Sequence, residues 1–282
     1  MFADTNIKMM LTAFMTKRKH LSKRPSTERG KEGPRKDGAL WIYGIHAVTA
    51  AAANPRRRCL RIIASAQGGH GVETRLAEAA EACATERPAP EIRDRLELDR
   101  ILPRDAVHQG AAALVTPLPE TTLEDVLRNA EGQKNAVVVI LDQVVDPRNV
   151  GAVLRSAAAF GALAVIVQDR HSPEATALMA KAAAGAMETM PLVRVTNLAR
   201  AMSALKHSEF WCIGMAPQAD KTIGEAGLGG RLALVFGSEG SGLRRLTAET
   251  CDLLVRVPIT SAVESLNLSN AVAIALYELR RD

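Results

Sequence analysis

Aromatic residues are scarce in this sequence, and the scarcity excludes one class of nucleic-acid-binding protein. Only 3% of the 282 residues are Phe, Trp or Tyr. Recognition-motif sheets bind RNA by stacking its bases on exposed aromatic rings, so a sheet of that kind is not expected. Any nucleic acid that binds this chain is held by charge and shape instead.

Cysteine is also rare, and its spacing excludes the common metal and disulfide frameworks. The four cysteines (Cys59, Cys83, Cys212 and Cys251) lie far apart, with no CxxC pair and no histidine at metal-ligand spacing. Reduced, structural thiols in a cytosolic protein are the ordinary explanation of such a pattern. We therefore expect no metal site and a cytoplasmic location.

Long apolar runs are absent as well. No stretch approaches the roughly 20 apolar residues of a membrane-spanning helix, so no membrane partner is expected. A hydrophobic fraction of 47% and a length of 282 residues suffice for a globular core and two domains. The net charge of +5 and the isoelectric point near 9.2 favour a polyanionic partner.

Residues 1–38 have the composition of a basic, disordered tail. A series of basic residues begins at Lys17 and continues to Lys36, with Ser, Gly and Pro between them. The tail strengthens RNA binding through phosphate contacts or is simply solvated, and the sequence leaves both open. A mitochondrial presequence is a third interpretation. A secretory signal is not favoured, because the mildly hydrophobic Met9–Met15 precedes most of the charges.

Residues 39–116 are expected to form a small α/β domain. An Ala-rich helix ending at Asn54-Pro55, a helix over Val72–Thr85, and strands at Cys59–Ala64 and Ala111–Thr116 are predicted. Residues 117–133, with a short helix around Leu123–Leu127, are expected to be a linker. His46 and His108 either contact RNA or, more commonly for a histidine at a strand end, bond to the backbone.

Residues 134–282 alternate between strand and helix patterns, which predicts a parallel sheet with helices on both faces. The apolar strand Ala136–Leu141 leads into a helix that Asp146 caps and Pro147 opens. Further strands are expected at Ala164–Val167, Met190–Val195, Glu209–Gly214, Leu232–Phe236 and Leu253–Val257. Helices are expected at Ala175–Ala184, at Leu198–Lys206 and from Val263 onward.

Two of these strands end in polar loops of the kind that bind ligands. Leu232–Phe236 runs into Gly237–Gly242, where three glycines surround Glu239, and Leu253–Val257 is followed by Ser265–Asn270. In α/β sheets, ligands bind beyond the carboxyl ends of the strands. The glycine order GxxGxG reverses the dinucleotide fingerprint and comes late in the chain, so the first loop does not predict a dinucleotide.

Taken singly, the polar residues near these loops have structural explanations. Arg155 lies in mid-helix beside the apolar stripe, where an arginine can extend along the surface. Asn149 fits a cap at the start of its helix, and Ser265 and Asn267 fit caps of the last helix. Composition and spacing do not decide between these roles and a functional site.

Together, three ordered segments resemble the motifs of the SpoU/TrmH class of SPOUT RNA 2′-O-ribose methyltransferases. They are Asn149–Arg155, Phe236–Leu243, and Pro258-Ile259 with Ser265–Ser269. Tyr43–His46 and His108–Gly110 also resemble the ribosomal-protein-L30e-like domain of bacterial members that methylate a guanosine of the large-subunit rRNA. Two departures, Ser261 in place of a frequent glycine and Glu264 before Ser265, bear on loop shape and target preference.

The resemblance implies a fold and a cofactor that spacing does not show. Members of the class tie the catalytic domain into a deep trefoil knot, bind S-adenosylmethionine there and act as homodimers. Backbone groups hold the cofactor, and at the matching positions these belong to Gly237, Val257 and Leu266. An apolar slot with backbone hydrogen bonds suits adenine, and glycine permits close approach to a ligand.

The resemblance also assigns catalytic roles. It places Arg155 facing the target 2′-hydroxyl, surrounded by Asn149, Glu239, Ser265 and Asn267. Arginine is a poor base because its pKa exceeds about 12. Either an RNA phosphate helps Arg155 to accept the proton, or Arg155 only stabilises the developing alkoxide.

The implied function is S-adenosylmethionine-dependent methylation of the ribose 2′-hydroxyl of a guanosine in 23S rRNA. One alternative is the same chemistry on tRNA. The other is a non-catalytic RNA-binding protein, a ribosome-assembly factor built on a retired enzyme. Intact Asn149, Arg155, Glu239 and Asn267 argue against retirement.

Overall fold

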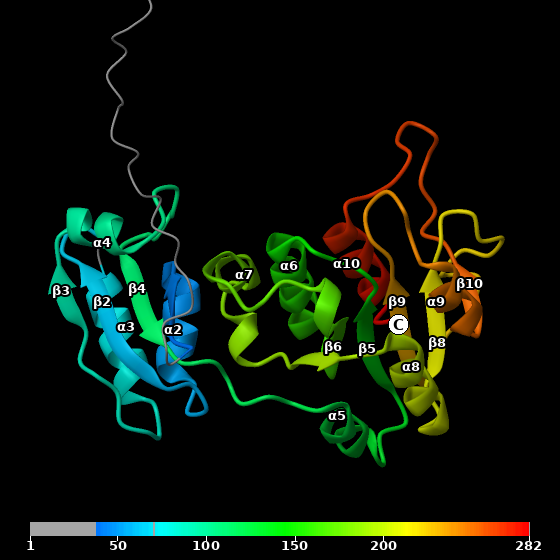
Figure 1. The fold of residues 1–282 in the computed structure, drawn as a ribbon, viewed down its shortest axis with the longest axis horizontal. Helices are drawn as coiled ribbons and strands as arrows, with labels where there is room; N and C mark the ends of the chain where they lie inside the picture. The colour runs from blue at the N-terminus through cyan, green and yellow to red at the C-terminus, as the bar shows by residue number, and fades with distance from the viewer. Residues whose placement is uncertain (1–37, 70, 282) are drawn as a thin grey trace, which may run out of the picture. The chain divides into compact units, whose positions relative to one another are not determined.

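The computed structural model describes residues 38–69 and 71–281. The predicted tail therefore lies outside the described residues, apart from Gly38. The described chain forms two sheets, one with the strand order β1-β4-β2-β3 and the other with the order β10-β8-β9-β5-β6-β7 (Figure 1). Among these residues, no helix combines the length and apolar character needed to cross a membrane.

The four-stranded sheet is mixed, and both of its faces are buried. Its elements are β1 (Leu40–Tyr43), α2 (Ile45–Ala53), β2 (Cys59–Ser65), α3 (Val72–Glu81), β3 (Glu91–Arg93), α4 (Arg95–Ile101) and β4 (Ala111–Val115). Because side chains alternate along a strand, Ile42 packs with α2 and α3, whereas Trp41 and Tyr43 pack with Leu98 of α4. We call residues 39–116 the small-sheet region.

The six-stranded sheet is wholly parallel, as the sequence predicted. Its strands are β5 (Ala136–Leu141), β6 (Ala164–Gln168), β7 (Leu192–Val195), β8 (Trp211–Met215), β9 (Arg231–Phe236) and β10 (Leu253–Val255). The accompanying helices are α5 (Leu123–Ala130), α6 (Pro147–Ala159), α7 (Ala177–Ala183), α8 (Leu198–His207), α9 (Arg245–Thr250) and α10 (Leu268–Glu278), with short 3-10 turns η1 (Asp169–His171) and η2 (Ala186–Glu188).

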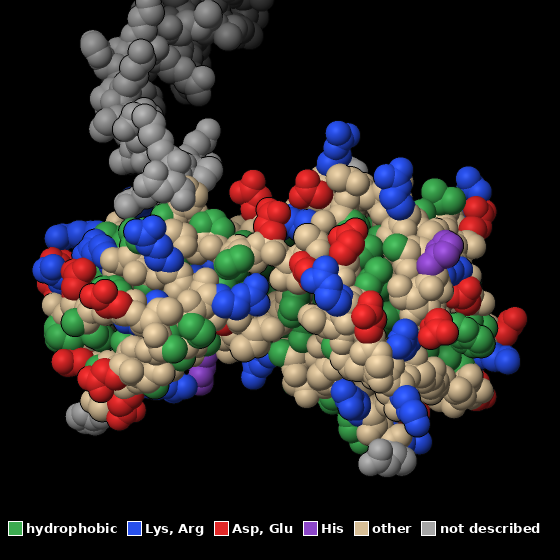
Figure 2. Space-filling view, turned by 90° about the horizontal axis from the view of Figure 1, so that it is seen from below, with side chains coloured by type: hydrophobic (Ala, Val, Ile, Leu, Met, Phe, Trp, Pro, Cys, Tyr) green, Lys and Arg blue, Asp and Glu red, His purple; other side chains and the backbone are tan. Residues whose placement is uncertain are grey.

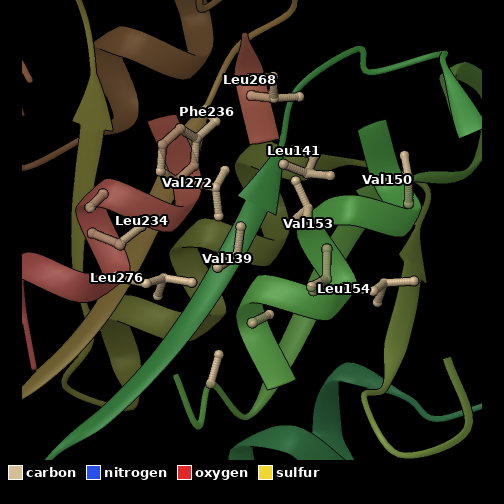
Figure 3. Packing of buried hydrophobic residues seen from close by; sticks show 14 of the residues in the cluster. Val139, Leu141, Val150, Val153, Leu154, Leu234, Phe236, Leu268, Val272 and Leu276 are labelled. Atoms are coloured by element: carbon tan, nitrogen blue, oxygen red, sulfur yellow. The ribbon is translucent and has the colours of Figure 1, made fainter. Parts of the chain in front are cut away.

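Both faces of this sheet are covered, which explains why its strands are continuous apolar runs. Val139 and Leu141 of β5 face one core, to which α6, α7 and α10 contribute. Figure 3 shows them with Val153 of α6 and Val272 of α10. Val138 and Ile140 face the opposite core, with side chains of α5 and α8.

The pairing of β5 with β9 positions the candidate site. These strands are distant in the chain but adjacent in the sheet, with Leu141 opposite Phe236. Because they are parallel, their carboxyl ends lie at the same edge. The segment that begins at Asp142 and the loop that begins at Gly237 therefore leave the sheet side by side (Figure 1).

The boundaries of the last elements differ from the prediction. The prediction of a helix from Val263 is wrong, because α10 begins at Leu268 with Asn267 as its N-cap. The side chain of Asn267 accepts a hydrogen bond from the backbone N–H of Ser269, which ends the preceding loop at that point. Strand β10 ends at Val255, so Val257 belongs to this loop, and α9 was not predicted.

The start of α6 agrees with the sequence. Asp146 accepts a hydrogen bond from the backbone N–H of Arg148 at 2.8 Å, and Pro147 occupies the first turn. Helix α6 also packs closely on α7 at Gly151, where an added Cβ would lie 2.5 Å from the carbonyl oxygen of Met179. Only glycine fits at that contact.

The net positive charge is not gathered into one patch on the face drawn in Figure 2. Lys and Arg side chains are interspersed there with Asp and Glu. Mixed charges of this kind keep the local potential low. An RNA contact on that face would therefore depend on individual basic side chains.

Candidate active site

The loop after β9 folds back on itself, and Gly237 is required for that return. The backbone N–H of Gly242 donates to the carbonyl oxygen of Ser238 at 3.0 Å. A Cβ added at Gly237 would lie 2.0 Å from the carbonyl carbon of Gly242. Glycine is thus needed because the backbone of the loop at Gly242 passes close to Gly237. The sequence had instead suggested close approach to a ligand.

Glu239 in this loop connects the three segments that the sequence singled out. Its Oε1 accepts hydrogen bonds from Nδ2 of Asn149 at 3.0 Å and from Nδ2 of Asn267 at 2.8 Å. The backbone N–H of Leu268 donates to the same oxygen at 3.2 Å. Nδ2 of Asn267 also lies 3.2 Å from Oδ1 of Asn149. We call Asn149, Glu239 and Asn267 the amide–carboxylate cluster.

The cluster resolves the alternatives that the sequence left open for its asparagines. Asn149 does not cap α6, because Asp146 does. Asn267 both caps α10 and donates to Glu239, so the two explanations hold together. Ser265 is not the cap; it lies exposed in the loop before α10.

Arg155 lies apart from the cluster. It follows Asn149 by six residues on α6, which is about 9 Å along the axis and about 120° away around it. Its side chain is exposed and forms no hydrogen bond or ion pair with any other residue in the described part of the chain. The structure therefore joins three of the five predicted catalytic residues and leaves Arg155 and Ser265 without a link to them.

The predicted cofactor residues lie in the loops around this edge of the sheet. Gly237, Val257 and Leu266 are each half-buried. Within residues 38–69 and 71–281, their backbone N–H and C=O groups form no hydrogen bonds. Half-buried backbone groups without partners are suited to bind the polar edge of a ligand. A hollow of about 330 Å³ lies elsewhere, between β10 and the loop that follows β8.

Two protein-family models match the chain, one over each of the two sheets. The SpoU rRNA Methylase family model matches residues 136–277, and a model described as RNA 2'-O ribose methyltransferase substrate binding matches residues 41–121. The chain belongs to the SpoU rRNA methylase family.

Curated relatives extend the similarity over most of this SpoU methylase. A Pseudomonas aeruginosa protein named 23S rRNA (guanosine-2'-O-)-methyltransferase RlmB is 42% identical over 243 residues, which cover 85% of this chain and 95% of that protein. The Escherichia coli K12 protein of the same name is 41% identical over 243 residues, covering 85% and 97%.

Solved structures of SpoU proteins share the fold. The methyltransferase AviRb from Streptomyces viridochromogenes, in complex with AdoMet, superposes with a TM-score of 0.69 at 21% identity, covering 86% of this chain and 89% of that one. An AdoMet-bound rRNA methyltransferase from Sinorhizobium meliloti gives 0.67 at 21% identity, covering 86% and 87%.

A buried carboxylate of this SpoU methylase lies at the same sheet edge and was not predicted from the sequence. Asp142 follows β5 and is fully buried; its Oδ1 accepts from Nε of Arg244 at 2.7 Å, and its Oδ2 accepts from the backbone N–H of Arg244 at 3.2 Å. Nη2 of Arg244 donates to Oε1 of Gln168 at 3.0 Å. Because a buried carboxylate is costly unless it is paired, Asp142 fixes the far end of the loop that carries Glu239.

Among the remaining candidates, His108 and two of the cysteines have structural roles. His108 is buried; it accepts from the backbone N–H of Gly110 at 3.1 Å and lies 3.2 Å from Oδ1 of Asp99, so the backbone-bonded role is confirmed. His46 is exposed, 3.4 Å from Arg75. Burial raises the pKa of Cys212 and of Cys251 to about 12, as expected of inert thiols. Within the described residues, no group of side chains is arranged to hold a metal ion.

Proposed function

We propose that this protein transfers a methyl group from S-adenosylmethionine to the ribose 2′-hydroxyl of a guanosine in 23S rRNA. The observation that carries the proposal is the amide–carboxylate cluster, in which Glu239 joins Asn149 and Asn267 at the carboxyl edge of a parallel sheet. The relatives that match 85% of the chain at 41–42% identity are named for this reaction.

The cofactor site in this proposal is the trefoil knot of the family, formed by the loops after β9 and β10 and the start of α10. The residues present fit the cofactor, because half-buried Gly237, Val257 and Leu266 offer backbone groups without partners. Glu239 forms no ion pair with any described residue, so its negative charge is available to favour a sulfonium. When bound, S-adenosylmethionine supplies an electrophilic methyl group.

Arg155 then acts on the RNA. Its guanidinium is permanently charged and offers five N–H donors. With no partner among the described residues, it is available to stabilise the oxygen of the target ribose as negative charge develops on it. Asn149 and Asn267 keep Glu239 in place, and Ser265 lies in the loop two residues before Asn267.

The small-sheet region is proposed to be an L30e-like RNA-binding domain, residues 39–116, joined by a linker at 117–133 to the SPOUT domain at 134–282. The substrate-binding model that matches residues 41–121 supports this assignment. An rRNA substrate agrees with the cytoplasmic location expected from the sequence. The basic residues at 1–38 would add phosphate contacts.

The active form is proposed to be a homodimer. Helix α10 exposes Ile274 and Tyr277, whose exposed fractions are 40% and 56%. Exposed apolar side chains on one helix suit a subunit contact. Sedimentation analysis should give about twice the chain mass of 30.2 kDa, and a monomer that retains full activity would contradict this part of the proposal.

Methyl transfer tests the function directly. The full chain would be incubated with labelled S-adenosylmethionine and either unmodified 23S rRNA or unmodified bulk tRNA, and methylated riboses would be mapped by their resistance to alkaline cleavage. We expect one resistant guanosine in 23S rRNA. Labelling of tRNA alone would overturn the substrate, and absence of both transfer and cofactor binding would overturn the enzyme assignment.

A further inference from the structure

A buried ion pair joins the small-sheet region to the region of the six-stranded sheet. Arg57 precedes β2, Glu188 ends η2, and they are 131 residues apart in sequence. Their exposed fractions are 2% and 8%. Nε of Arg57 lies 3.1 and 3.0 Å from the two carboxylate oxygens of Glu188, and its Nη2 lies 2.7 Å from Oε1.

Neighbouring groups complete the hydrogen bonding of this pair. Nη1 of Arg57 donates to the carbonyl oxygen of Thr116 at 2.7 Å. Nδ2 of Asn54 donates to Oε2 of Glu188 at 2.9 Å and to its carbonyl oxygen at 3.1 Å. A buried pair is tolerated when its members are so satisfied, and removal of one member leaves an uncompensated charge.

The surfaces around the pair consist largely of small apolar side chains. Ala180 of α7 is 3% exposed and belongs to the core of the small-sheet region with Val48. At Gly185, an added Cβ would lie 2.9 Å from Cβ of Ala50, so α2 packs directly on this glycine. Lys181 donates to the carbonyl oxygen of Val107 and lies 5.5 Å from the ring centre of Tyr43.

Such small side chains bury apolar area, but they define the relative position of the two packed surfaces poorly. Alanine surfaces can slide past one another with little loss of contact, because they lack the interlocking shapes of larger side chains. Directional hydrogen bonds between a planar guanidinium and a carboxylate permit one arrangement. Buried ion pairs add little net stability compared with apolar replacements, and specifying one geometry is a recognised use for them.

We infer that Arg57 and Glu188 are positioning residues for the methyl-transfer reaction. They hold α2 of the small-sheet region against α7 and η2. RNA bound by the small-sheet region then reaches the carboxyl edge of the six-stranded sheet in a single position. The effect on rRNA rests on the proposed function, whereas the docking itself does not. Positioning matters because a misplacement of about 1 Å can lower a rate by about a hundredfold.

The first test uses the full chain with Arg57→Ala and Glu188→Gln, and Arg58→Ala as the matched control. Arg58 is adjacent and exposed, so its variant loses the same charge without touching the pair. Hydrogen exchange reports opening of each segment. We expect each pair variant to exchange faster in both α2 and η2, and the control to match the wild type. Faster exchange confined to the mutated segment would overturn the inference.

Steady-state kinetics on rRNA, together with cofactor affinity, distinguish a positioning role of the pair from damage to the cofactor site. For both pair variants we expect kcat/KM on 23S rRNA to fall by at least about tenfold, with unchanged affinity for S-adenosylmethionine by calorimetry and a change below about threefold in Arg58→Ala. Activity of Arg57→Ala equal to that of the control would overturn the positioning role. If the wild type binds the cofactor but does not methylate 23S rRNA, the proposed substrate is wrong. The hydrogen-exchange measurement still tests whether the pair holds the two regions together.

A double variant covers the case in which single variants misfold. Arg57→Met with Glu188→Met replaces the pair by apolar side chains, which usually preserves folding. We expect a folded protein with reduced rRNA methylation, because the directional bonds that set the register are gone. A double variant that methylates rRNA as fast as the wild type would show that the pair does not set the register.

Discussion

The carboxyl edge of the parallel sheet and the middle of α6 both carry residues of the proposed site, and the chain holds them differently. At the sheet edge, one oxygen of Glu239 accepts three hydrogen bonds from two other segments. On α6, the side chain of Arg155 is exposed and forms no hydrogen bond or ion pair within the described chain. The first region is organised by contacts within the protein, whereas the guanidinium of Arg155 has no such contact in the described chain.

This difference separates cofactor binding from methyl transfer. Groups that are already held in place lose little conformational entropy when a ligand binds. An unpaired arginine side chain loses its conformational entropy on binding. We therefore expect variants of the cluster at the sheet edge to weaken cofactor binding, and variants of Arg155 to affect turnover with RNA. The four predictions that follow test this division.

The largest effect is expected for Arg155→Ala. Removal of a donor that stabilises developing negative charge costs about 100-fold to 1,000-fold in kcat, and cofactor affinity should stay unchanged because Arg155 has no link to the cluster. Single-turnover methylation and calorimetry measure the two quantities. Arg200→Ala, which removes another exposed charge, is the control; substantial turnover by folded Arg155→Ala would refute the assigned role.

Glu239→Ala should weaken S-adenosylmethionine binding by about tenfold to a hundredfold, because three donors lose one charged acceptor and each such bond contributes about 1 kcal/mol. Glu239→Gln keeps an acceptor and should lose less affinity. Calorimetry on both variants gives the comparison. Wild-type affinity in Glu239→Ala would mean that the cluster does not organise the cofactor site.

Asp142→Asn should act on the same region from a distance. It removes the charge that pairs with Arg244 and costs about 1–3 kcal/mol, which lowers Tm by several degrees. Because the ion pair anchors the loop of Glu239, cofactor affinity should also fall several-fold. An Asp142→Asn protein with lowered Tm but unchanged affinity would show that this anchor is purely structural.

The smallest effect is expected for Ser265→Ala. Ser265 is exposed and forms no hydrogen bond within the described chain. The affinity for S-adenosylmethionine in the absence of RNA should therefore change by less than about threefold. Any effect should appear only in turnover with RNA, as for Arg155. A tenfold loss of cofactor affinity would place Ser265 with the organised region and break the division drawn here.

Local sequence signals predicted the bounds of an element well where an apolar run or a cap with proline marked them. Ala136–Leu141 is a strand with the predicted bounds, and Asp146 with Pro147 starts α6 as predicted. The last helix was extended too far, to Val263, because periodicity alone does not mark a start. Its true start depends on Asn267, whose side chain has both a capping bond and a bond to Glu239.

The sequence by itself determined the parallel α/β architecture and, through three ordered motifs, the SpoU family. These follow from properties of short segments: apolar runs, caps and motif spacing. Only the tertiary structure decided that Asn149 meets Glu239 while Arg155 does not, and that Arg57 pairs with Glu188 and Asp142 with Arg244. Those pairs join residues 90, 131 and 102 positions apart, and contacts at such separation depend on how the strands are ordered in the sheets, which local propensity does not encode.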